Sequence, residues 1–275
     1  MYTRLVSYTC HHLPASDRRQ VVSLHRKLFS NHHTICNGHP RGCSFPRFRS
    51  DSDSAVPNAI QHFLQSRPTL VANWLLANQP LTDISKLLSL VDQYISYIPD
   101  PSPQWLRPRL LSDAELSLSI KHRYALSHFL SSPQFEYALV LEDDALIQPS
   151  SMSVVSELTE YLSDLSFSGA VYIDLSAGCN LSVVNLLPPI QNLSSGASLY
   201  SPFFPSSRTT CAYLINKPFA EAFLGAFTSP LAPIDYEYMF TLTCLHRNQM
   251  LSACLWTEPN VFVHGSKDRF MSSLI

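Results

Sequence analysis

Three consecutive carboxylates, Glu142-Asp143-Asp144, are the residues of this chain whose types and spacing most directly suggest chemistry. They follow the continuous apolar run 137–141, which has the length and composition of a strand buried on both faces. Inside a sheet, carboxylates are costly unless they are paired or bind a metal. We therefore expect the triplet just beyond the carboxyl end of the strand, where open α/β sheets bind ligands.

Alternation along the strand divides the triplet, because side chains two residues apart point to the same side. Glu142 and Asp144 would converge, and Asp143 would point away. Two convergent oxygen ligands suit Mg²⁺ or Mn²⁺, and such an ion could hold a diphosphate and stabilise its charge as a sugar leaves. The alternative interpretation is a solvated acidic turn with one capping aspartate.

The elements that would position the triplet alternate between strands and helices. Strand patterns occupy residues 2–8, 137–141, 169–175, 209–216 and 259–264, and helical patterns occupy 16–29, 112–131, 151–164, 218–227 and 235–246. Ser16 is a candidate N-cap, and Ser112 with Glu115 forms a capping box. This alternation predicts an α/β fold with a mostly parallel sheet flanked by helices.

Residues 31–108 form a less regular insertion within a single expected domain, 1–275. Residues 31–58 show no periodicity and are interpreted as an irregular loop, and residues 177–208 are a second expected loop. Within the insertion, residues 81–98 have the spacing of an amphipathic helix, and the proline-rich residues 99–108 predict an extended connector.

The start of this insertion gathers His32, His33, Cys36, His39 and Cys43 within twelve residues. Histidine and cysteine at such spacings are zinc ligands in other proteins, so a structural zinc site is one interpretation. However, the spacing matches no zinc pattern and the flanking sequence is irregular. A plain loop is therefore the favoured interpretation.

Composition excludes several classes of protein. The net charge is −2 and no run of Lys or Arg exceeds two residues, which argues against a nucleic-acid partner. No apolar stretch approaches the roughly 18–20 residues of a transmembrane helix, so any membrane association would be peripheral. The seven cysteines include no CxxC pair and indicate free thiols in a reducing compartment. A cytoplasmic protein is the expectation.

Five segments, in order, resemble the family 25 glycosyltransferases of lipopolysaccharide biosynthesis and collagen galactosylation. They are Glu115-Leu-Ser-Leu-Ser-Ile-Lys-His122, Tyr137-Ala-Leu-Val-Leu-Glu-Asp-Asp144, Thr210-Cys-Ala-Tyr-Leu-Ile-Asn216, Pro233-Ile-Asp235 and Pro259-Asn-Val-Phe-Val-His264-Gly-Ser266. The first segment departs from the family, because Ser117, Leu118 and Lys121 stand where the family has Gly, Cys and Ser.

The resemblance implies a GT-A-like, Rossmann-like fold, a nucleotide-sugar donor such as a UDP-sugar, Mn²⁺ or Mg²⁺, and transfer to a glycan or lipid-linked acceptor with inversion. Asp144 would be the direct metal ligand, supported by Glu142. Glu142 and Asp143 would also contact metal-bound water or the donor. His264 would complete the metal or diphosphate site, although a histidine before Gly-Ser can be a plain strand-end residue.

The same resemblance assigns the remaining candidates. Asp235 would be the catalytic base that takes the proton of the acceptor hydroxyl; it could instead cap its helix, with Glu237 as a nearby substitute. His122 would face the donor diphosphate, or merely lie on its helix. Arg18 would pair with phosphate, or be an ordinary surface charge.

Two other classes of function fit the carboxylates. A metal-dependent phosphoester hydrolase would use the same triplet, but it would need further ligands at strand ends, and Asp174 is the sole obvious supply. A non-catalytic glycosyltransferase-like protein that binds a partner or glycan is also compatible, because of the altered segment before His122.

Overall fold

The computed structural model describes residues 4–11, 18–35, 111, 113–165, 167–176, 184, 187–202, 205–227, 230 and 232–265. Several predicted features lie outside the described residues: the helix at 81–98, the connector at 99–108, and the capping residues Ser16 and Ser112. Most of the His- and Cys-rich loop, for which a zinc site was one interpretation, also lies outside them, including Cys36, His39 and Cys43.

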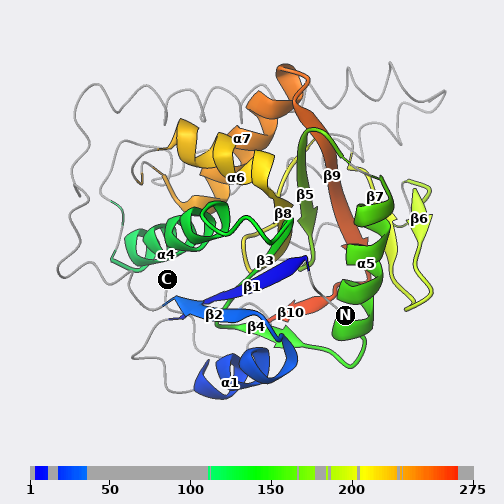
Figure 1. The fold of residues 1–275 in the computed structure, drawn as a ribbon, viewed down its shortest axis with the longest axis horizontal. Coiled ribbons are helices and arrows are strands. Elements are labelled where there is room, and N and C mark those ends of the chain that lie inside the picture. Colours follow the sequence, from blue (N-terminus) through cyan, green and yellow to red (C-terminus); the bar gives the residue numbers. More distant parts are fainter. Residues whose placement is uncertain are drawn as a thin grey trace, which may run out of the picture.

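The described strands form two sheets, and the larger one is the centre of the fold (Figure 1). Its strands are β1 (Leu5–Cys10), β2 (His32–Ile35), β3 (Tyr137–Glu142), β5 (Ala170–Asp174), β6 (Gln191–Asn192), β7 (Ser198–Tyr200), β8 (Ala212–Asn216) and β9 (Leu251–Glu258). They are ordered β2-β1-β3-β8-β5-β9-β7-β6. The smaller sheet pairs β4 (Ala145–Ile147) with β10 (Phe262–His264).

The described helices lie close to the predicted positions. They are α1 (Arg19–Leu28), α4 (Asp113–Leu130), α5 (Ser151–Leu165), α6 (Lys217–Ala226) and α7 (Ile234–Arg247). At the start of α6, the side chain of Asn216 accepts a hydrogen bond from the backbone of Phe219, and Pro218 occupies the first turn. Among the helices of the described residues, none has the length and apolar character needed to span a membrane.

The prediction of a mostly parallel sheet is wrong, because the sheet is mixed. β1 runs parallel to both β2 and β3, and β5 runs parallel to β9. β8, however, lies between β3 and β5 and is antiparallel to both, and β7 is antiparallel to β6 and β9. The apolar sequence of β8 indicates burial on two faces, which a central strand has in either direction. Composition therefore could not give its direction.

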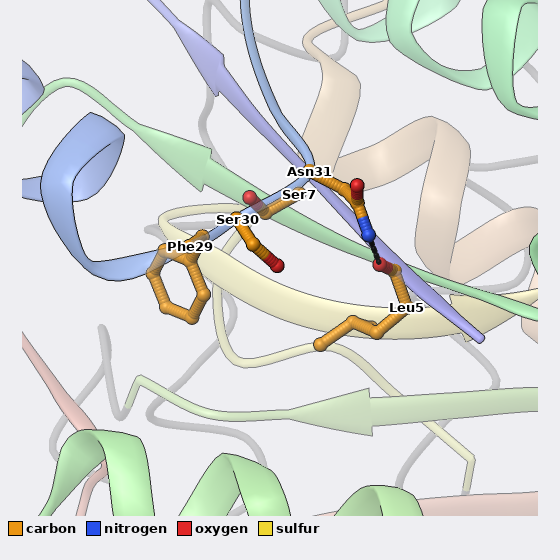
Figure 2. Close-up of a pocket in the computed structure, with 5 residues that line it drawn as sticks. All are labelled: Leu5, Ser7, Phe29, Ser30 and Asn31. Carbon is orange, nitrogen blue, oxygen red and sulfur yellow. Dashed lines mark hydrogen bonds between the residues drawn. The ribbon is translucent and has the colours of Figure 1, made fainter. Parts of the chain in front are cut away.

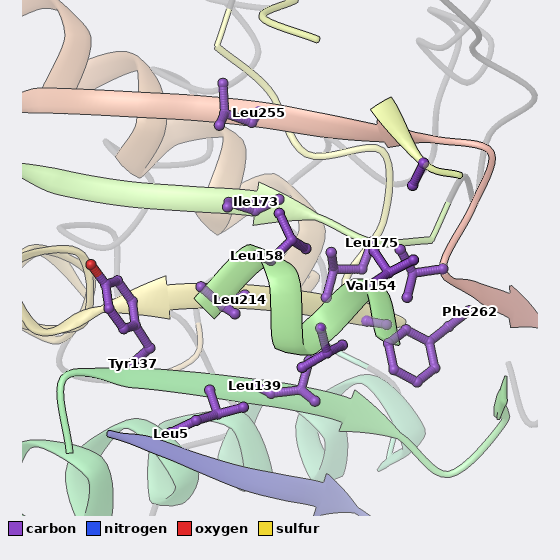
Figure 3. Packing of buried hydrophobic residues seen from close by; sticks show 14 of the residues in the cluster. Leu5, Tyr137, Leu139, Val154, Leu158, Ile173, Leu175, Leu214, Leu255 and Phe262 are labelled. Atoms are coloured by element: carbon purple, nitrogen blue, oxygen red, sulfur yellow. The ribbon is translucent and has the colours of Figure 1, made fainter. Parts of the chain in front are cut away.

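Helices cover both faces of the sheet, which gives three layers (Figure 1). On one face, Leu139 and Leu141 of β3 pack with α5 residues such as Leu158 (Figure 3). On the other face, Ala138 and Val140 pack with residues of α4, α6 and α7. The double cover explains why β3 is apolar at every position before its last residue, as the sequence predicts for a central strand.

Several strands were not predicted. β2 falls in the expected loop 31–58, β6 and β7 fall in the expected loop 177–208, and β9 follows α7 where no strand was assigned. β2 and β6 are edge strands, short and largely polar, so they lack the apolar alternation of a half-buried strand. In β9 only residues 254–257 are buried, and a buried run of this length is too short to indicate a strand by itself.

The exit of α1 is tied to β1 (Figure 2). Asn31 Nδ2 donates to the carbonyl of Leu5 (3.4 Å), and the backbone N–H of Ser7 donates to the carbonyl of Asn31 (2.9 Å). Together with Phe29 and Ser30 these residues line a cavity of about 10 Å³, room for about one water molecule. These contacts hold α1, and the side chains it carries, beside the central strands.

Gly169 offers a test of the packing between β5 and β9. A Cβ atom at Gly169 would lie 2.6 Å from both the carbonyl oxygen of Met250 and Oγ of Ser252, whereas one at the exposed Gly225 would meet nothing within 4 Å. We expect Gly169→Ala to lower the free energy of unfolding by about 1–3 kcal/mol. Gly225→Ala should leave it unchanged or raise it by up to about 1 kcal/mol. Urea unfolding measures both, and equal stability of the two variants would contradict the described pairing.

Candidate functional site

The acidic triplet lies at one edge of the large sheet, at the carboxyl end of β3. Glu142 is the last residue of the strand, lies beside Cys10 of β1, and donates its backbone N–H to the carbonyl of Cys211 (2.7 Å). Asp143 and Asp144 form the turn into β4. Because β8 runs antiparallel to β3, the segment before β8 meets the end of β3 here. The predicted position of the triplet, at the carboxyl end of a buried strand, is confirmed.

Asp143 is bound by two basic side chains. Nη1 of Arg18 donates to one of its carboxylate oxygens, and Nδ1 of His11 lies 3.1 Å from the other. All three side chains are buried, and Nη2 of Arg18 also lies 3.8 Å from a carboxylate oxygen of Asp144. Arg18 and Asp143, each a predicted donor contact, therefore bind each other. Their charges compensate, and the pair fixes the turn that carries Asp144.

His25 of α1 fixes the residue that follows the triplet. Its Nε2 lies 2.8 Å from the carbonyl oxygen of Ala145, and its Nδ1 lies 2.8 Å from Oγ1 of Thr9. A carbonyl oxygen only accepts, so Nε2 carries the proton and Nδ1 accepts from the Thr9 hydroxyl. Burial lowers the pKa of His25 to about 4, which keeps the ring neutral in this role.

Asp144 and His264 lie side by side although 120 positions separate them in sequence. β10 pairs with β4 so that His264 stands opposite Ala145, the residue after Asp144. The backbone N–H of Gly265 donates to the carbonyl of Asp144 (2.9 Å), and Nδ1 of His264 lies 3.7 Å from a carboxylate oxygen of Asp144. The structure therefore brings together two of the predicted metal ligands.

The donor atoms here fit a divalent ion. One carboxylate oxygen of Asp144, one ring nitrogen of His264 and Sγ of Cys211 all lie within 4.8 Å of one another. Two oxygen or nitrogen ligands at about 2.1 Å from one ion are at most about 4.2 Å apart, which the 3.7 Å between Asp144 and His264 satisfies. Glu142, also a predicted ligand, is not a member of this group, and Cys211 was not predicted.

Cys211 is completely buried. Burial and the charges of Asp144 and Glu142 raise the pKa of its thiol, so the sulfur is protonated in the protein without an ion. A bound cation would favour the thiolate instead.

Thr210 joins Glu142 to Asp235. Its Oγ1 lies 2.8 Å from a carboxylate oxygen of Glu142 and 2.9 Å from one of Asp235, to which the backbone N–H of Thr210 also donates (2.8 Å). A hydroxyl group has one proton and donates to one carboxylate at a time, so the second contact requires a proton on a carboxyl group. Burial and the charge of Asp144 raise the pKa of Glu142 to about 7, so Glu142 can hold such a proton near neutral pH.

Asp235 lies in the first turn of α7, whose N-cap is Pro233, so the alternative that Asp235 caps its helix is wrong. Burial and the charge of Glu142 raise the pKa of Asp235 as well. Glu237, the substitute base, is fully buried and accepts from Arg123 (2.7 Å), which removes it from the exposed edge. The structure thus brings Asp235 beside the triplet.

His122 lies behind Glu142 in the protein interior. Its Nδ1 lies 2.7 Å from the hydroxyl of Tyr213, which in turn lies 2.6 Å from the hydroxyl of Tyr238. Its Nε2 lies 3.7 Å from a carboxylate oxygen of Glu142. The ring has no exposed surface, and burial lowers its pKa to about 3. His122 therefore lies near Glu142 without a hydrogen bond from Nε2 to it, and its ring has no exposed atom through which it could contact a diphosphate.

Sequence reasoning missed His11, His25, Thr210 and Cys211. His11 follows β1 as the triplet follows β3, so a search for polar residues after parallel strands would have found it. Thr210 and Cys211 precede a strand, and they reach the same edge because β8 is antiparallel. No sequence signal indicated that direction.

The neutral ring of His25 makes stability depend on pH. In the unfolded chain a histidine takes up its proton near pH 6.5, but His25 in the folded protein does so near pH 4. Its contribution is therefore complete above about pH 6.5 and is lost as the pH falls towards 4. We expect the stability difference between wild type and His25→Gln to shrink by about 1.4 kcal/mol per pH unit in that window.

Urea unfolding at several pH values measures this difference. His246→Gln, at an exposed position of α7, is the matched control for the substitution. A His25→Gln difference that does not change with pH would contradict the buried neutral ring.

A scan of the chain against models of protein families finds no match, and a search of curated proteins finds none. The resemblance to family 25 glycosyltransferases therefore rests on the five segments themselves.

Proposed function

We propose that this protein is a metal-dependent glycosyltransferase with a GT-A-like fold. It would transfer a sugar from a nucleotide-sugar donor, such as a UDP-sugar, to a hydroxyl of a glycan or lipid-linked acceptor, with inversion. The observation that carries the proposal is the convergence of Asp144, His264, Glu142 and Asp235 at one sheet edge from three separate segments. The same segments carry the family resemblance.

The charged groups of this edge divide into two sides. Asp144 and His264 would hold Mn²⁺ or Mg²⁺, which would supply positive charge to a diphosphate leaving group. Asp235 is linked to Glu142 through the Thr210 hydroxyl and is not a member of the group formed by Asp144, Cys211 and His264. Such a separation suits a reaction in which the leaving group and the attacking hydroxyl need different partners.

Asp235 would act as the base. The oxygen of the acceptor hydroxyl attacks the anomeric carbon, the bond from that carbon to the diphosphate oxygen breaks, and the hydroxyl proton passes to Asp235. Burial raises the pKa of Asp235 above that of an ordinary aspartate, which brings it closer to the working pH and improves proton transfer. Thr210 contacts Oδ1, so Oδ2 is the oxygen that would take the proton.

The hydrolase alternative has less support. Asp174, the further ligand it would need, is completely buried and accepts from the backbone N–H (2.6 Å) and Nε (3.3 Å) of Arg208. Arg208 also donates to Glu258 (2.8 Å) and stacks over Trp256. This ion-pair network links β5 to β9 and therefore has a structural role. Phosphate release from nucleotides without any acceptor would favour the hydrolase.

The metal side is tested by donor binding. We expect calorimetry with a panel of UDP-sugars and Mn²⁺ to give a donor that binds the wild type. Because Asp144 supplies a charged ligand, Asp144→Asn should weaken that binding by at least the roughly 10–100-fold that loss of a supporting metal contact costs. Asp164→Asn, at an exposed position of α5, is the matched control. If no UDP-sugar of the panel binds, the non-catalytic alternative is favoured.

The base is tested by turnover. Asp235→Asn should lower transfer by about 10²–10⁴-fold, the usual contribution of a general base, with the donor Kd unchanged. The measurement is a steady-state assay with the donor identified above, alongside calorimetry on the same variant. Glu221→Gln, at an exposed position of α6, should behave as wild type. Full activity of Asp235→Asn would remove Asp235 from the mechanism.

A further inference from the structure

Cys211 reaches the triplet through the backbone. It is the residue before β8, and β8 pairs with β3 so that Ala212 stands opposite Leu141. The carbonyl of Cys211 accepts from the backbone N–H of Glu142 at 2.7 Å. The position of its sulfur is thus set by the central sheet rather than by a loose surface segment.

The sulfur completes a set of three donor atoms from three segments. Asp144 supplies oxygen from the turn after β3, His264 supplies nitrogen from β10, and Cys211 supplies sulfur. Asp144 and Cys211 are buried, and His264 keeps 19% of its side chain exposed, which leaves the group accessible from the β10 side. Three protein ligands with an open position are typical of catalytic rather than structural metal sites.

We propose that Cys211 is a ligand of the metal site and shifts its preference from Mg²⁺ towards Zn²⁺ and Co²⁺. The inference rests on the proposed function only in sharing its metal site. Mg²⁺ and Ca²⁺ prefer oxygen ligands, whereas a thiolate favours softer ions, and one Asp, one His and one Cys suit the zinc group. On binding, the thiol loses its proton to solvent and a sulfur–metal bond forms, with no change of oxidation state.

The other buried cysteines lack this arrangement in the part of the chain that the structure describes. Cys254 lies on β9, and its thiol donates to the carbonyl of Ser206. Neither Cys10 nor Cys254 belongs to a group of three metal-ligating side chains. Cys254 therefore provides a matched control, since it is also buried and its replacement leaves the three donor atoms unchanged.

Cobalt absorption spectroscopy on the full chain tests the proposal. Titration of the wild type with Co²⁺ should produce a sulfur-to-cobalt charge-transfer band in the near ultraviolet that saturates at one ion per chain and disappears on addition of Zn²⁺. The band should be lost in Cys211→Ser, Asp144→Asn and His264→Gln and kept in Cys254→Ser. Zn²⁺ affinity of Cys211→Ser should fall by more than about tenfold, and Mg²⁺ affinity should not fall.

Other results overturn the proposal. Co²⁺ binding without the band, or a band that survives Cys211→Ser, excludes Cys211 as a ligand. Should Cys211→Ser fail to fold, zinc-edge X-ray absorption of the wild type and of Asp144→Asn replaces it. A sulfur at about 2.3 Å that is lost in Asp144→Asn supports the site, and its absence from the wild type refutes it.

The two proposals fail separately. If Mn²⁺-dependent donor binding is found without any sulfur signal, the glycosyltransferase assignment stands and Cys211 is no ligand. If the sulfur signal depends on Asp144 but no nucleotide sugar binds, the metal site stands and the glycosyltransferase assignment fails.

Discussion

Three carboxylates lie largely withdrawn from water at the end of β3, and the surrounding elements are arranged to compensate them. An uncompensated buried carboxylate would cost several kcal/mol, so each needs a partner in the folded protein. Asp143 receives Arg18 and His11 from the first segment of the chain, Glu142 receives Thr210 from the segment before β8, and Asp144 receives His264 from β10. The N-terminal, central and C-terminal parts of the chain therefore all meet at this edge.

Glu142 separates two environments that differ in charge. On one side stand Asp144, His264 and the Cys211 sulfur, and on the other stand Asp235 and the buried ring of His122. Because Glu142 is coupled by charge to Asp144 and by hydrogen bonding to Thr210, a change on either side alters its proton affinity. A cation on the metal side would favour the ionised form of Glu142.

The sequence predicts the parts of this arrangement that depend on local pattern. The unbroken apolar run before Glu142 identifies a central strand, and helical spacing locates α4, α5, α6 and α7 closely. Strand direction, however, depends on which elements pack together, and the antiparallel β8 is what brings Thr210 and Cys211 to the edge. The ion pair between Arg18 and Asp143 could not be predicted either, because the sequence gives residue types but not which oppositely charged side chains lie in contact. His264 was found because its segment matched a family pattern.

The ladder between β4 and β10 has only three registered pairs, yet it holds His264 against Asp144. A ligand bound to both Asp144 and His264 would also hold β10 against β4. The measured affinity of that ligand would then include the free energy of docking β10. Conversely, withdrawal of the histidine would require this short ladder to open. Ligand residence time at this edge would therefore be set by local strand dynamics.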